Sequence, residues 1–158
     1  MMGPLGGSSG AGGPQIDTNA PVQVALLVPK SDPGAAPVAR GLENAVRLAM
    51  ADLQGVRIDL RVYDTAGSAS VAASKAQQAV DEGVKIILGP LFGESANAAA
   101  VAVADEGVNV LSFSNNTSIA GGNLFVLGAT FDNTADRLMS YATRQGKGDV
   151  VVLHTDSV

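Results

Sequence analysis

The sequence contains no cysteine, and its single histidine is His154. Without cysteine the chain has no disulfide bond, no thiolate nucleophile and no cysteine-ligated metal. A lone histidine inside an apolar run is typical of a structural residue rather than a zinc ligand or a catalytic base. We therefore predict no metal site.

Charged residues are also few, at 16%, and the ten lysines and arginines are scattered from Lys30 to Lys147. A protein that follows a phosphate backbone needs its cations grouped on one face. Nucleic acid is therefore not expected as a partner.

Long apolar runs are missing as well, since none approaches the ~20 residues that a membrane-spanning helix needs. Residues 1–14 lack the positive start and apolar centre of a signal peptide. If the protein is exported, its signal has been removed or lies upstream of this sequence.

Apolar residues make up 46% of the 158 residues, which is enough for one ordinary domain with a core, but a second full domain would not fit. Residues 1–14 (MMGPLGGSSGAGGP) are almost wholly Gly, Ser, Pro and Ala. Such a composition cannot bury enough surface to offset the entropy of ordering. We predict a flexible tether over residues 1–20 and ordered structure from Pro21.

Apolar runs of β-prone residues indicate strands. The run at residues 56–63 alternates apolar and polar side chains, which predicts a strand at an edge of the sheet. The run at residues 84–88 consists of apolar residues and Lys85, whose apolar stem can be buried, and it predicts a central strand buried on both faces. The other predicted strands are residues 22–28, 108–113 and 149–154, with a short apolar segment at residues 124–127.

Apolar residues recurring every three or four positions indicate helices. The first stripe is Val38, Leu42, Val46, Ala49 and Leu53, and the second is Val71, Ala72, Ala76, Ala79 and Val80. A third helix is predicted in the alanine-rich run 96–104, beginning around residues 93–95 and stopped by Gly107. A fourth should start near Asn133 or Thr134, end by Gly146 and carry Leu138, Met139 and Ala142 inward.

The motif Asp-Glu-Gly-Val occurs at residues 81–84 and again at residues 105–108, one strand, loop and helix later. Repeated βα units with short loops favour a mainly parallel sheet with right-handed crossovers. A closed barrel would need about eight such units. We therefore predict an α/β fold with a doubly wound, three-layer α/β/α sandwich.

Three predicted loops leave the carboxyl ends of strands, at residues 30–37, 90–95 and 114–122, and such loops converge on one crevice in a doubly wound sheet. Their hydroxyl and amide groups suit hydrogen bonding to a small polar molecule better than bond breaking. A capped helix start and ordinary polar loop tips are the alternatives. The candidate ligand-binding residues are Ser31, Gly93, Glu94, Ser95, Ser114, Asn115 and Asn116.

Enzyme motifs are not found. No G-x-G-x-x-G follows the first strand, where Pro33 and Pro37 stand, and residues 93–97 lack the G-x-S-x-G spacing. Asp64 is expected in a turn or cap role. We predict no catalytic residue and no cofactor, so a hydrolase or nucleotide-dependent enzyme is only a weak third alternative.

Several segments resemble the type I periplasmic solute-binding fold, in its leucine/isoleucine/valine-binding branch. They are residues 24–29 (VALLVP), 40–45 (RGLENA), 86–95 and 110–114, and the resemblance extends over residues 22–158. Within that group, residues 87–92 (ILGPLF) and 111–115 (LSFSN) are most similar to the penicillin-binding protein activators of Gram-negative bacteria. These are lipoproteins that help peptidoglycan synthases from the outer membrane side.

The resemblance implies that residues 21–128 form lobe one and that residues 129–158 only begin lobe two, so the chain looks like a fragment. It also implies a periplasmic location. The glycine-rich start resembles the spacer after a lipoprotein's acylated cysteine, which implies an outer-membrane lipid anchor, although that cysteine is absent here.

Two functions follow from the resemblance, both non-enzymatic. The first is a penicillin-binding protein activator whose partner is a peptidoglycan synthase, a class A penicillin-binding protein. The alternative is the substrate-binding component of an ABC transporter for amino acids or another small polar solute, with an ABC permease as partner and the ligand in the interlobe cleft. Family members hold an amino acid's carboxylate at positions matching residues 93–95 and 114–116. A carboxylate at Glu94 would repel that group unless it turns away, which favours the activator.

Overall fold

A computed structural model describes residues 16–17, 19–128, 130–151 and 153, and the chain divides into two units, Met1–Gly128 and Ala129–Val158. In the first unit five strands form one sheet in the order β2-β1-β3-β4-β5, and all four pairings are parallel. The strands are β1 (Val22–Val28), β2 (Ile58–Asp64), β3 (Ile86–Leu88), β4 (Asn109–Ser112) and β5 (Leu124–Val126). The predicted parallel α/β fold is confirmed, with β2 at an edge and β3 in the centre.

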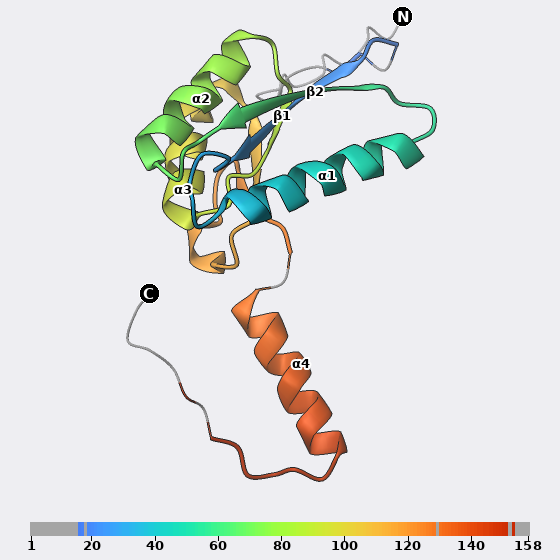
Figure 1. Ribbon diagram of the computed structural model, residues 1–158, viewed down its shortest axis with the longest axis vertical. Coiled ribbons are helices and arrows are strands. Elements are labelled where there is room, and N and C mark those ends of the chain that lie inside the picture. Colours follow the sequence, from blue (N-terminus) through green and yellow to red (C-terminus); the bar gives the residue numbers. More distant parts are fainter. Residues whose placement is uncertain (1–15, 18, 129, 152, 154–158) are drawn as a thin grey trace, which may run out of the picture. The chain divides into compact units, whose positions relative to one another are not determined.

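Helices cover both faces of this sheet (Figure 1). They are α1 (Ala36–Asp52), α2 (Ala69–Asp81) and α3 (Gly93–Ala102). Successive residues of a strand point to opposite faces. On β1, Ala25 and Leu27 join the core beneath α2 and α3, whereas Leu26 and Val28 join the core beneath α1. The predicted three-layer sandwich is therefore confirmed.

Alanine allows α2 and α3 to lie close to each other and to the sheet. The inward residues Ala72, Ala76 and Ala79 of α2 are fully buried, as are Ala96 and Ala99 of α3. Such small side chains give little area each, but they permit close backbone approach and a dense core. The apolar stripe predicted for the second helix is therefore confirmed at Ala72, Ala76 and Ala79.

The stripe predicted for the first helix is wrong at three of its positions. Val38 and Leu53 are exposed, as is Ala49, and Leu53 lies beyond the end of α1. The residues that contact the sheet are Ala39, Leu42 and Val46. The sequence offers apolar residues on more than one side of this helix, and only packing against the sheet decides which side is buried.

Element boundaries differ from the prediction by a few residues. Helix α1 begins at Ala36 and takes Pro37 into its first turn, where the missing N–H has no helical partner in any case. Helix α3 ends at Ala102, and the 3₁₀ helix η1 (Ala104–Glu106) follows before Gly107 adopts a left-handed conformation with φ 66°. Gly107 therefore ends η1, and α3 itself stops earlier than predicted.

The second unit contains helix α4 (Phe131–Arg144), which starts slightly earlier than predicted. The side chain of Thr130 accepts a hydrogen bond from the Asn133 N–H at 3.2 Å and so caps its first turn. Leu138 and Met139 are exposed, contrary to the prediction that they point inward. The described residues of this unit include no second layer that could cover them.

The strand predicted at residues 149–154 is also wrong where it is described. Residues 149–151 and 153 belong to no strand, and Val151 and Leu153 are exposed. A strand needs a neighbour to satisfy its backbone hydrogen bonds, and none exists among the described residues of this unit. His154 and residues 1–15 of the predicted tether lie outside the described residues. Within the part described, none of the helices is both long and apolar enough to cross a bilayer.

Candidate functional site

The loops after β3 and β4 meet at the carboxyl edge of the sheet. Leu88 and Leu111 are paired at the ends of these strands. Just beyond them, the Ser112 Oγ donates to the Pro90 carbonyl at 3.0 Å, and the Phe113 N–H donates to the same oxygen at 3.0 Å. Two of the three loops predicted to converge are therefore joined directly.

The loop after β4 is held by its own polar side chains. The Ser112 Oγ accepts from the Ser114 N–H at 3.0 Å, and the Ser114 Oγ accepts from the Asn116 N–H at 3.1 Å. The Asn116 Oδ1 then accepts from the Ser118 N–H at 2.9 Å and from its hydroxyl at 2.7 Å. Each side chain closes a turn two residues ahead. Ser114 and Asn116, both predicted ligand-binding residues, thus also shape the loop.

Helix α3 begins against this loop. A Cβ atom placed on Gly93 would lie 3.5 Å from the Ser114 Oγ and 3.7 Å from the Ile119 side chain, in ordinary van der Waals contact. The residue before the helix, Phe92, supplies no side-chain cap. The first N–H groups of α3 therefore have no side-chain cap from this residue, and they carry the partial positive charge of a helix start.

Ser95 and Glu94 lie in that first turn with opposite burial. Glu94 is exposed and forms no ion pair with any described residue. Ser95 is only 2% exposed, and its hydroxyl makes no hydrogen bond with another described residue. Every fully buried side-chain nitrogen or oxygen in the described residues has a partner. The Ser95 hydroxyl is therefore the part of this residue that still reaches the surface.

Ser31 lies at the ends of β1 and β2, at the same edge. Its N–H donates to the Asp64 Oδ1 at 3.2 Å, and the Ala66 N–H donates to the same oxygen at 2.9 Å. Burial raises the pKa of Asp64, but these hydrogen bonds outweigh it, so the pKa lies below its usual value. Asp64 has the predicted turn role. No hydrogen bond in the described part of the chain joins Ser31 to the loops around α3.

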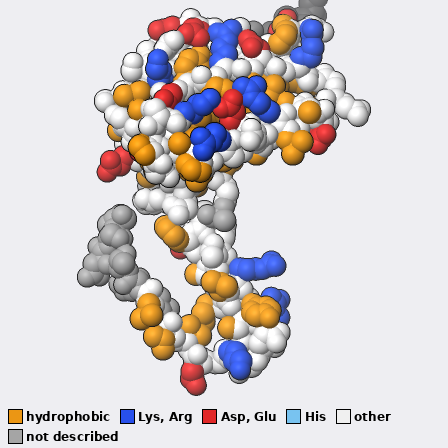
Figure 2. All heavy atoms as spheres, viewed as in Figure 1, with side chains coloured by type: hydrophobic (Ala, Val, Ile, Leu, Met, Phe, Trp, Pro, Cys, Tyr) orange, Lys and Arg blue, Asp and Glu red, His pale blue; other side chains and the backbone are white. Residues whose placement is uncertain are grey.

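The cation at this edge is already paired. The Lys30 Nζ lies 2.8 Å from the Glu43 carboxylate, which Arg47 also contacts at 2.7 Å. These hydrogen bonds, that of Lys30 first, lower the pKa of Glu43. Figure 2 likewise shows basic and acidic side chains side by side on one face of the first unit. The loops at residues 90–95 and 114–122 contain no lysine or arginine.

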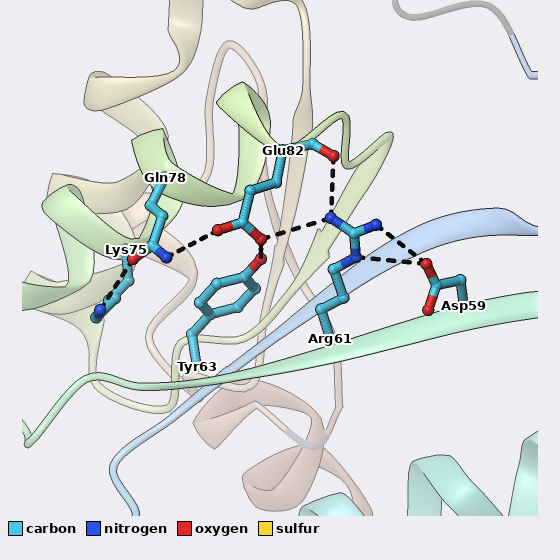
Figure 3. A network of polar contacts seen from close by, with 6 residues as sticks. All are labelled: Asp59, Arg61, Tyr63, Lys75, Gln78 and Glu82. Carbon is cyan, nitrogen blue, oxygen red and sulfur yellow. Dashed lines mark hydrogen bonds and ion pairs between the residues drawn. The ribbon is translucent and has the colours of Figure 1, made fainter.

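A second polar cluster joins β2 to the end of α2 (Figure 3). The Tyr63 hydroxyl donates to the Glu82 carboxylate at 2.6 Å, and Arg61 donates to the Glu82 carbonyl at 3.0 Å and to Asp59 at 3.2 Å. Burial, and then the hydrogen bond to Glu82, raise the pKa of Tyr63 to about 12. No sequence pattern predicted this cluster. Because its groups satisfy one another, we assign it a structural role.

Two open depressions lie at the other, amino-terminal edge of the sheet. Their volumes are about 400 Å³ and 750 Å³, and Pro21 and Gln23 contribute to both. Neither contains a predicted ligand-binding residue. The predicted ligand-binding residues lie instead at the carboxyl edge, around the start of α3 and at the end of β1.

Comparisons with known proteins add the following. Residues 21–158 match the family described as periplasmic binding protein, and the comparison with curated proteins gave no significant match. A solved structure of the branched-chain amino acid transporter substrate binding protein LivJ from Streptococcus pneumoniae, in complex with isoleucine, superposes with a TM-score of 0.63 at 18% identity. The matched region covers 70% of this chain and 34% of the LivJ chain.

Two further solved structures are similar. The leucine binding protein LivK from Thermotoga maritima gives a TM-score of 0.65 at 20% identity, covering 78% of this chain and 37% of its own. A solute binding protein of an ABC transporter from Rhodopseudomonas palustris, in complex with 3,4-dihydroxybenzoic acid, gives 0.67 at 21% identity, covering 79% and 36%. At such identities the likeness shows the fold. The chain spans little more than a third of the length of these proteins.

Proposed function

Because this chain belongs to the periplasmic binding protein family, we propose that it is a non-enzymatic binding protein that holds a small polar ligand at the carboxyl edge of its sheet. The observation that carries the proposal is the junction of the loops after β3 and β4 through Ser112 and Pro90. It brings the start of α3 and the Ser114–Asn116 turn together around a common surface.

The groups at this surface are hydrogen-bonding groups. They comprise the first N–H groups of α3 and the side chains of Ser95, Ser114, Asn115 and Asn116. Asn115 is exposed and forms no side-chain hydrogen bond with a described residue. None of these hydroxyls contacts a described general base, which supports binding rather than catalysis.

We further propose that the protein is periplasmic and acts as the substrate-binding component of an ABC transporter. The names of the similar solved proteins support this choice, because they are transporter or solute binding proteins, two of them in complex with isoleucine and 3,4-dihydroxybenzoic acid. An ABC permease would then be the partner. The first unit supplies one set of ligand contacts, centred on the start of α3.

A thermal-shift panel tests the proposal. The chain is heated with millimolar L-leucine, L-isoleucine, L-leucinamide, 4-methylpentanoate or 3,4-dihydroxybenzoate. A ligand at about 100 times its Kd stabilises the folded state by about 2.7 kcal/mol. We expect at least one compound to raise Tm, and no shift with any of them would contradict the proposal.

Asparagine substitutions at opposite ends of the same region locate the binding. Asn115→Ala removes an exposed amide at the carboxyl edge and should reduce the ligand-induced shift. Asn109→Ala removes an exposed amide at the amino end of β4 and should leave it unchanged. Equal shifts in both variants would place the ligand elsewhere.

The penicillin-binding protein activator is the second candidate, and the outer-membrane lipid anchor belongs with it. Its support is the resemblance of residues 87–92 and 111–115, and none of the comparisons adds to it. A pull-down with a class A penicillin-binding protein tests it directly. Capture of the synthase together with no ligand-induced shift would put the activator first.

A further inference from the structure

The carboxyl edge of the first unit carries an unpaired negative charge and lacks an unpaired positive one. Lys30 is held by Glu43 at 2.8 Å, and the loops that build the start of α3 and the turn after β4 contain no lysine or arginine. Glu94 is exposed in the first turn of α3 and has no ion-pair partner among the described residues. A ligand that reaches this turn therefore meets a carboxylate.

Ser95 is an independent sign that a ligand belongs here. It is 98% buried by the first turn of α3 and its surroundings, yet its hydroxyl makes no hydrogen bond with a described residue and still reaches the surface. A hydroxyl that reaches solvent hydrogen-bonds water when no ligand is present. A bound ligand would take the place of that water.

We propose that Glu94 sets the charge selectivity of this site, so that it accepts ligands presenting a neutral or positively charged polar group to the start of α3 and rejects those presenting a carboxylate there. The inference rests on the proposed function and names the class of ligand. Two carboxylates a few ångströms apart at a partly solvated position repel each other enough to reduce affinity about tenfold. At the same place Glu94 increases the affinity for an ammonium group and leaves the affinity for a neutral amide group unchanged.

Glu94 also stabilises α3, because an acidic residue in the first turn of a helix interacts favourably with the helix dipole. That role predicts an effect of Glu94 on stability alone. The selectivity role predicts an effect on the relative affinity of ligands that differ in charge. The two roles are therefore separated by measuring affinity as well as Tm.

The experiment uses three probes that share one apolar side chain, namely L-leucinamide, L-leucine and 4-methylpentanoate. Their affinities are measured by calorimetry for the wild type, Glu94→Gln and Glu106→Gln. Glu106 is the matched control because it is an exposed acidic residue in η1, beyond the other end of α3. Measurements at about 20 mM and about 300 mM salt show whether the effect is screened as a charge interaction must be.

We expect the wild type to prefer leucinamide over 4-methylpentanoate, and Glu94→Gln to reduce that preference about tenfold at low salt and less at high salt. Glu106→Gln should leave it unchanged. A wild type that prefers the carboxylate, or equal effects of the two substitutions, would overturn the inference while leaving the proposed function intact.

If a different panel compound is the one that binds, its affinity is measured for the same variants. An anionic compound must then bind Glu94→Gln more tightly than wild type. No binding by any compound would overturn the proposed function, and this inference with it.

Ser95→Ala provides the second measurement. We expect it to lower the affinity for the preferred probe severalfold without lowering Tm in the absence of ligand, because no internal hydrogen bond is lost and alanine favours the helix. A lower Tm with unchanged affinity would show that the Ser95 hydroxyl is structural and would count against the inference.

Discussion

Ser112 is the residue on which the geometry of the carboxyl edge depends most, so Ser112→Ala is the sharpest test of that geometry. Its fully buried hydroxyl donates to the Pro90 carbonyl and accepts from the Ser114 N–H, each at 3.0 Å. After the substitution the Pro90 carbonyl keeps the Phe113 N–H as a donor. The Ser114 N–H, in contrast, loses the acceptor recorded for it.

The expected loss of stability follows from these contacts. Each net hydrogen bond contributes about 0.5–1.5 kcal/mol, and an unsatisfied buried N–H costs about 1–3 kcal/mol. Because the two contributions overlap at Ser114, we expect Ser112→Ala to lower the free energy of unfolding by about 2–3 kcal/mol. At a typical m value this lowers the urea midpoint by about 1 M.

Ser118→Ala is the matched control, because it removes an exposed hydroxyl of the same loop that contacts only Asn116. Its expected cost is below about 0.5 kcal/mol. Urea denaturation followed by circular dichroism measures both variants. If Ser112→Ala cost no more than Ser118→Ala, the two loops would not be joined through Ser112, and the argument for a shared surface would fail.

Two further predictions concern the first unit. Gly89 has φ 87°, and a Cβ there would overlap the Leu27 carbonyl oxygen, so Gly89→Ala should lower the free energy of unfolding by about 3 kcal/mol or more. Gly41→Ala, in an uncrowded position of α1, should raise the free energy of unfolding by about 0.5–1 kcal/mol. Thermal melts that rank the two alanine variants equally would contradict this. Burial, and then Glu82, raise the pKa of Tyr63 to about 12, so its neutral phenol stabilises the fold fully below pH about 10 and this contribution disappears as pH rises toward 12. The stability difference between wild type and Tyr63→Phe should therefore shrink over that range, while Tyr141→Phe, at an exposed tyrosine, should show no such trend.

Much of the fold could be predicted from local patterns. The run at residues 84–88 is apolar apart from Lys85 because β3 lies in the centre of the sheet, and the alternation at residues 56–63 reflects the edge position of β2. The first signal arises from burial on two faces. The second arises because Leu60 and Val62 join the core beneath α1, whereas Asp59 and Arg61 belong to the polar cluster. The position of the candidate residues around α3 followed from the same reasoning, because parallel strands end at a common edge.

The errors came where the outcome depends on partners distant in the sequence. The run at residues 149–154 has strand composition, but its described residues pair with nothing. Val38 and Leu53 are apolar, yet Val38 lies off the side of α1 that contacts the sheet and Leu53 lies beyond the end of this helix. The bond between Tyr63 and Glu82 joins residues from different elements and leaves no local signal.

One missed feature did have a local signal. Ser112, Ser114, Asn116 and Ser118 occur at every second position. Side chains of this type commonly accept a hydrogen bond from the N–H two residues ahead. The spacing therefore predicts a self-supporting turn, and it indicates that the candidate ligand-binding residues Ser114 and Asn116 also have a structural role.

Amide hydrogen exchange of the chain, with and without the panel compound that gives the largest thermal shift, tests the central claim most directly. Binding at the carboxyl edge predicts that the compound slows exchange mainly at residues 91–97 and 113–118. Slowed exchange confined to the amino-terminal edge, around Gln23 and Lys85, would contradict it.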